Sequence, residues 1–151
     1  MPLHAQDAAR WDRELLAVAE AALARAAALA APGPYQLEAA IQSAHSQRRL
    51  GADVPPAAIV ALYDALVALQ PTVGALVSRA CALADADGPA AGLAALARIA
   101  ARDVETYQPY WAALAHVARA AGDAAAAAHA RTRAVGLSSD AAVRRFLLAA
   151  G

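Results

Sequence analysis

The side chains with the greatest potential for chemistry are four histidines and one cysteine. They are His4, His45, His116, His129 and Cys81. A transition-metal site needs nitrogen or sulfur ligands at short spacings, such as two histidines four residues apart on one helix face. No two of these histidines have that spacing, and none lies near the cysteine in the sequence. We therefore predict no metal site.

Catalytic motifs give no better candidate. The sequence contains no GxSxG nucleophile motif, no glycine-rich phosphate loop and no clustered pair of carboxylates. Asp85 and Asp87 flank a turn, where aspartate is common because its carboxylate bonds to nearby backbone N–H groups. Cys81, as the single cysteine, can form no intramolecular disulfide, and we expect a buried structural thiol. The sequence thus predicts a non-enzymatic protein without a cofactor.

A 34-residue period organises the second half of the chain. Gly88 and Gly122 are one period apart, and the segment from Trp111 to Ala134 follows the tetratricopeptide (TPR) pattern. In that pattern, large residues meet small ones where two antiparallel helices touch. One period before Trp111, Leu114, Ala115 and Ala134, the sequence has small or apolar residues at Val77, Ala80, Cys81 and Ala100. The chain is therefore expected to be a stack of helical hairpins, an architecture typical of binding proteins.

Proline, glycine and capping residues divide the chain into about eight predicted helices. The expected spans are 7–30, 35–49, 56–69, 73–86, 89–102, 108–121, 123–135 and 139–150. We expect one domain over 1–151, with an N-terminal helix in 1–31, hairpins over 33–137 and a capping helix over 139–151. The loop 51–56 is longer than a regular TPR turn. In the first helix, an apolar stripe is expected to face the core, made of Leu15, Val18, Ala22, Leu23, Ala26 and Leu29.

Composition supports an all-α fold, a TPR-like helical-hairpin solenoid. The 151 residues are 60% hydrophobic, mostly alanine and leucine, and β-branched residues never alternate with polar ones over a strand length. Thirteen arginines balance 13 acidic residues without a basic run, so no nucleic-acid contact is expected. The N-terminus lacks signal-peptide features, and Arg25 interrupts the apolar stretch 21–31. We expect a cytoplasmic protein without membrane contact.

Several segments together resemble a known family. Residues 6–13 resemble a degraded QDRxRWDR motif, and 33–41 followed by His45 resemble a GPYQLQAAIAAxHA segment. Residues 87–92 match DGPxAG in the family's order and spacing. These features are similar to the C-terminal TPR-like extension of one group of extracytoplasmic-function (ECF) sigma factors of bacterial RNA polymerase. The resemblance covers nearly the whole chain, from Gln6 to about Leu147.

The resemblance implies a regulatory role in transcription. Family members carry two sigma domains before this region, and nothing in this sequence corresponds to them. The chain is then either an excised C-terminal domain or a stand-alone relative. The expected partners are sigma domains in cis, RNA polymerase or another regulatory protein, and activating and inhibitory roles both stay open. The motifs mark eight candidate contact residues, Asp7, Arg10, Trp11, Asp12, Arg13, Tyr35, Gln36 and His45.

Trp11 has two interpretations. Packing in the core against Leu15 and Val18 is the simpler role for a tryptophan at helical spacing. The charged residues on both sides of it instead favour a junction with the sigma domains.

The concave face of a TPR stack supplies a second set of candidates. The repeat register predicts which residues of the first helix of each repeat face inward. In one repeat these are Ala75, Ser78, Ala82 and Asp85, and in the next they are Gln108, Ala112, His116 and Arg119. Small residues beside polar ones form a groove that can accept a helix or an extended segment. Exposure of these side chains to solvent without any partner is the alternative.

Two other functions compatible with the sequence are a stand-alone TPR adaptor for a peptide or helix of an unrelated protein, and a small-molecule sensor with a pocket between Tyr107, Tyr110 and Trp111. The sequence does not decide the oligomeric state.

Overall fold

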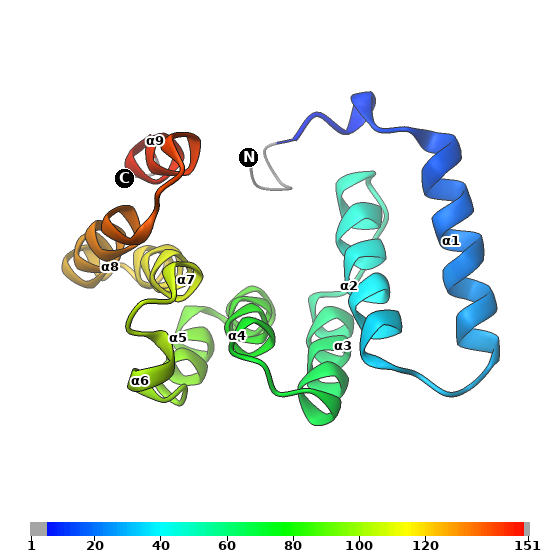
Figure 1. Cartoon of the computed structure of the whole chain (residues 1–151), viewed down its shortest axis with the longest axis horizontal. Coiled ribbons are helices and arrows are strands. Elements are labelled where there is room, and N and C mark those ends of the chain that lie inside the picture. The colour runs from blue at the N-terminus through cyan, green and yellow to red at the C-terminus, as the bar shows by residue number, and fades with distance from the viewer. Residues whose placement is uncertain (1–5, 150–151) are drawn as a thin grey trace.

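The computed structural model describes residues 6–149, and within that range all regular structure is helical. Figure 1 shows the helices following an open arc, with α1 at one end and α9 at the other. The all-α helical-hairpin fold is thereby confirmed. The helices are α1 (Arg13–Ala28), α2 (Pro34–Arg49), α3 (Pro56–Leu69), α4 (Val73–Asp87), α5 (Pro89–Ala97), α6 (Ala101–Val104), α7 (Gln108–Ala120), α8 (Ala124–Leu137) and α9 (Ala141–Ala149), preceded by the 3-10 helix η2 (Ala8–Arg10).

Three helical hairpins make up the arc: α2 with α3, α4 with α5, and α7 with α8. Each hairpin packs on the next, since α3 contacts α4 and both helices of the second hairpin contact α7. The terminal helices α1 and α9 pack on α2 and α8, respectively. In Figure 1, α2, α4 and α7 lie along the inner side of the arc. No helix in the described range is long and apolar enough to cross a membrane.

The core forms two clusters, one among α2, α3 and α4 and the other among α4, α5 and α7. The first joins Leu37 and Ile41 of α2 to Leu66 of α3 and Ala75 of α4. The second joins Val77 and Ala80 of α4 to Leu96 of α5 and Val117 of α7. Val77 and Ala80 occupy the positions that the repeat register predicts to be packed.

Two positions in the second hairpin require glycine: Gly88 at the turn and Gly92 at the contact between its helices. Gly88 links α4 to α5 with φ 94°, in the left-handed region that glycine adopts without strain. Gly92 lies where α4 and α5 come closest, because a Cβ there would lie 2.6 Å from Ala84 Cβ and 2.9 Å from Ala80 O. The DGPxAG segment is therefore a turn followed by a close helix contact.

The first predicted helix is wrong at its N-terminal end. Its expected start at Asp7 is the cap of η2, and the α-helix begins only at Arg13. The reason is a second cap, because the Asp12 carboxylate accepts a hydrogen bond from Leu15 N at 2.9 Å. Trp11 lies between the two helices in extended conformation.

The apolar stripe expected on this helix is also wrong in part. Leu15, Val18 and Leu29 are 66%, 64% and 78% exposed. The partly buried face is rotated from the predicted one and carries Leu16, Glu20, Leu23 and Ala26. The Glu20 carboxylate accepts a hydrogen bond from Ser43 Oγ of α2 at 2.6 Å. Because α1 is the end of the arc and packs mainly on α2, only one narrow face is covered.

The predicted helix 89–102 is two helices in the structure. α5 ends at Ala97, and Ala100 has extended backbone at φ −61° and ψ 131° before α6 begins. The break allows Ile99 to contact the second core cluster while Val104 is also buried. Ala100 is therefore exposed and not at a packed repeat position.

The capping helix α9 begins at Ala141, close to its expected start at 139. Asp140 accepts hydrogen bonds from Ala142 N at 2.6 Å and Val143 N at 3.2 Å. Leu147 is buried, whereas Val143 and Phe146, expected on the same covered side, are 38% and 41% exposed. Residues 150 and 151 of the predicted helix lie outside the described range, as does His4.

Candidate partner-binding groove

The inner face of α2 carries a line of polar side chains. Pro34 at the first helical position sets the start of the helix, and Leu37 and Ile41 bury the adjacent face in the first core cluster. With that face buried, Tyr35, Glu38, Gln42 and His45 follow each other at helical spacing along the inner side. Tyr35 is 86% exposed, the highest value among the large hydrophobic side chains described.

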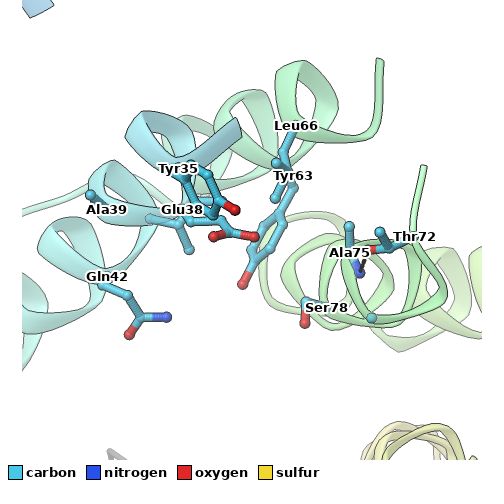
Figure 2. Close-up of a pocket in the computed structure, with 11 residues that line it drawn as sticks. Tyr35, Glu38, Ala39, Gln42, Tyr63, Leu66, Thr72, Ala75 and Ser78 are labelled. Carbon is cyan, nitrogen blue, oxygen red and sulfur yellow. Dashed lines mark hydrogen bonds between the residues drawn. The ribbon is translucent and has the colours of Figure 1, made fainter. Parts of the chain in front are cut away.

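The inner faces of α2 and α4 border an open pocket of about 460 Å³. α3 packs against both helices, whereas α2 and α4 make few direct contacts, so a gap persists above α3. Figure 2 shows Tyr35, Glu38 and Gln42 projecting from α2, Ser78 from α4, and Tyr63 of α3 between them. We call this pocket the α2–α4 groove; its remaining lining residues are Ala39, Ile41, Leu66, Thr72, Gly74 and Ala75.

The groove combines polar and aromatic side chains with small and apolar ones. Tyr63 is half-buried, which raises the pKa of its phenol, while a hydrogen bond with the Ser78 side chain acts in the opposite direction. The phenol is therefore neutral at pH 7 and can donate or accept a hydrogen bond. Thr72 is occupied as the N-cap of α4, since its Oγ1 accepts from Ala75 N at 3.1 Å.

His45 and Asp85, which do not line the groove, interact electrostatically. Burial lowers the pKa of His45, as does the nearby Arg48, while the charge of Asp85 acts to raise it. Burial also raises the pKa of Cys81 to about 11, with a smaller contribution from Asp85. A thiol with that pKa stays protonated and is a poor nucleophile, which agrees with the structural role expected for Cys81.

The predicted contact residues are only partly brought together. Tyr35 and Ser78 line the α2–α4 groove, and His45 and Asp85 interact electrostatically beside it. Gln36 lies on α2 but does not line the groove. Two of the four expected inner residues of α4, Ala75 and Ala82, are 8% and 6% exposed and belong to the packing. On α7, His116 and Arg119 are exposed and Gln108 is half-buried, and none of the three lines this pocket.

The N-terminal motif residues have local structural roles. Asp7 accepts a hydrogen bond from Ala9 N at 3.0 Å and caps η2, as Asp12 caps α1. Trp11 is half-buried, but its expected partners Leu15 and Val18 are exposed, so a core formed by these three residues is wrong. Arg10 and Arg13 are exposed. The Arg49 guanidinium donates to Gln6 O at 2.8 Å, which holds this segment against the end of α2.

A second pocket, of about 470 Å³, lies beside Tyr110 and Trp111. The Trp111 indole donates to Val104 O at 3.0 Å and Glu105 O at 3.2 Å, and the Arg133 guanidinium lies 5.0 Å from the indole centroid. Arg133 also donates to Glu105 O at 3.1 Å. The indole N–H and this guanidinium N–H thus hold the α6–α7 connection in place. Tyr107 does not line this pocket.

Sequence reasoning missed Glu38, Gln42 and Tyr63. The signal for the first two was available, because Tyr35, Glu38, Gln42 and His45 repeat at intervals of three and four residues. The part played by Tyr63 was not visible, since it depends on how α3 packs against α2 and α4. Within residues 6–149, no three or more His, Cys, Asp or Glu side chains are grouped so that they could hold a metal ion. The arrangement suits reversible binding of a polar segment.

Comparison with known proteins gives one relative. The chain is 30% identical over 145 residues to an uncharacterized protein of Rhizobium meliloti (strain 1021). The match covers 96% of this chain and 34% of that protein, so the chain spans about a third of its relative's length. No protein-family model matches the chain. No solved structure matches it either.

Proposed function

We propose that this chain is a non-catalytic interaction domain of a sigma-factor-like transcription regulator, located in the cytoplasm of a bacterium. The observation that carries the proposal is the sequence resemblance of 33–41 and 87–92 to the C-terminal extension of ECF sigma factors. The domain would contact sigma domains in cis, RNA polymerase or a signalling partner. Such contacts regulate by stabilising one of two conformations, so no bond chemistry is needed.

The positions of these two motifs support the proposal. Residues 87–92 form the turn and close contact between α4 and α5, which is a role in folding. Residues 33–41 form the start of α2, and Tyr35 and Glu38 of this segment line the α2–α4 groove. Polar side chains that project into an open groove do not contribute to the core, so a role in binding accounts for them better than a role in stability.

The length of the relative also supports the proposal. The Rhizobium meliloti protein is about three times as long as the matched segment. A region of this kind can therefore exist within a longer chain, as the C-terminal extensions of sigma factors do.

Site-specific photo-crosslinking tests the proposed contacts. A photoreactive residue at Gln42 faces the α2–α4 groove, and one at Ala128 on the exposed side of α8 is the matched control. We expect adducts with sigma-domain or RNA polymerase peptides from position 42 and not from position 128. Equal yields from the two positions, or no such peptides, would reject the proposal.

A stand-alone adaptor is the second candidate. All described residues that line the α2–α4 groove fall within residues 35–78, a single continuous segment of this chain. An immunoblot of source cells separates the two candidates. A species much larger than 15.3 kDa is expected for the regulatory domain, and a species of 15.3 kDa that crosslinks only to an unrelated protein is expected for the adaptor.

A further inference from the structure

Of the described residues that line the α2–α4 groove, Glu38 alone is charged. Among residues 6–149, no cationic side chain lies within ion-pair distance of it. Arg79 is the nearest arginine in sequence to the α4 wall, and it is engaged by Asp64. The groove therefore carries an uncompensated negative charge in a chain of net charge zero.

Two tyrosine rings accompany this carboxylate. Tyr35 precedes Glu38 by one helical turn and is almost fully exposed, while Tyr63 forms the base of the groove. Figure 2 shows Tyr35 on the same helix as Glu38, and Tyr63 between that helix and Ser78. Tyrosine faces attract cations, and an arginine guanidinium can stack on such a ring while its N–H groups bond to a carboxylate.

The other polar groups that line the groove can accept hydrogen bonds from a ligand that donates them. The Gln42 carbonyl, Ser78 Oγ and Tyr63 Oη can each accept a hydrogen bond, and the Thr72 hydroxyl already accepts one from its own helix. An arginine side chain has five N–H donors and no acceptor. A volume of about 460 Å³ is large enough for one such side chain with part of its backbone.

We propose that the α2–α4 groove binds an arginine side chain of a partner polypeptide, with Glu38 as its counter-charge and Tyr35 and Tyr63 beside the guanidinium. The proposal rests on the proposed function for the existence of a protein partner, and it specifies the chemistry of the partner residue. A carboxylate with two rings favours arginine over lysine, whose ammonium group cannot bond to a carboxylate through a planar fork.

The test is an NMR titration of the ¹⁵N-labelled chain with acetyl-Ala-Arg-Ala-amide. The matched probe replaces arginine by citrulline, which has the same shape without the charge. We expect the arginine peptide to shift the amide signals of Glu38, Tyr63, Gly74 and Ser78 with a Kd in the millimolar range, on the order of that expected for a single side chain. The citrulline peptide should leave these signals unchanged.

Two variants assign the effect to the carboxylate. Glu38→Gln should weaken binding about tenfold, as expected for loss of one charge-assisted hydrogen bond. Glu14→Gln, an exposed glutamate on α1, should bind as the parent chain does. Circular dichroism confirms that both variants are folded. Unchanged affinity of Glu38→Gln, equal shifts with citrulline, or equal affinity for a lysine peptide would overturn the proposal.

These results are separate from the crosslinking test of function. If the peptide fails to bind while position 42 still crosslinks to sigma-domain or polymerase peptides, only the arginine site is rejected. If the peptide binds while those crosslinks are absent, the proposed function fails and the arginine site stands.

Discussion

The two parts of the arc bury their side chains to very different extents. From α4 to α8, five side chains at helix contacts have 0% exposure: Ala80, Val117, Ala118, Ala130 and Ala134. From α1 to α3, large side chains are left open, with Leu15, Val18 and Leu69 between 55% and 66% exposed. Small residues at the contacts of α4, α7 and α8 let these helices approach closely, whereas a gap lies between α2 and α4. The comparison indicates that the closely packed helices α4 to α8 contribute most of the buried contacts, while the proposed binding groove lies between α2 and α4.

The largest expected contrast is between two leucines. Leu96→Ala removes a side chain that is 1% exposed in the second core cluster, and we expect a loss of about 2–5 kcal/mol in the free energy of unfolding. Leu15→Ala removes one that is 66% exposed on α1, with an expected change within about 0.5 kcal/mol. Urea denaturation of both variants measures the difference. Similar losses in the two variants would contradict the difference in packing between α4 to α8 and α1 to α3.

A glycine pair tests the close contact of α4 with α5. Gly92→Ala places a Cβ against a backbone carbonyl that cannot move aside, and overpacking should cost about 1–3 kcal/mol. The gain in helix propensity offsets only about 1 kcal/mol of this. Gly136→Ala on α8 meets nothing within 4 Å and should be neutral or slightly stabilising. Thermal unfolding compares the two, and a stable Gly92→Ala chain would show that the helices can separate without loss.

The N-caps of α1 and α8 distinguish local from global stability. Asp12→Ala and Asp123→Ala each remove a carboxylate that accepts a 2.9 Å hydrogen bond, at a cost of about 1 kcal/mol. Because α1 packs mainly on α2 at the end of the arc, we expect Asp12→Ala to reduce amide hydrogen-exchange protection in α1 alone. Asp123→Ala should reduce the global stability as well. Loss of protection throughout the chain in Asp12→Ala would mean that α1 is part of the cooperative core.

The smallest expected effect is the change in stability with pH that arises from His45 on α2. The pKa of His45 is lowered from 6.5 in the folded chain, so the unfolded chain binds more protons as the pH falls below 6.5. The contribution of neutral His45 to the free energy of unfolding is fully present above pH 6.5. It is lost as the pH falls from 6.5 through the pKa of the folded chain. An NMR titration of the His45 ring should give a pKa below 6.5, and His45→Gln should flatten the decline of stability on the acid side. An identical decline in the variant would assign it to other groups.

Much of the fold could be predicted because its signals are local. Pro56 and Thr72 mark the starts of α3 and α4, and Gly88 and Gly122 mark turns that require positive φ. The spacing of Val77, Ala80 and Trp111 identifies the hairpin register. These features depend on backbone conformation and on residues within a few helical turns, so the sequence alone reveals them.

The groove depended on contacts between distant segments. The outward position of Leu15 and Val18 follows from the place of α1 at the end of the arc, where among the described helices it packs mainly on α2, and no local pattern encodes that place. Glu38 and Ser78 face one space because α3 holds α2 and α4 apart. The sequence by itself determined the helices and the regular register, since both follow from short-range preferences. Only the tertiary structure decided which polar residues meet, because that depends on the relative placement of three helices.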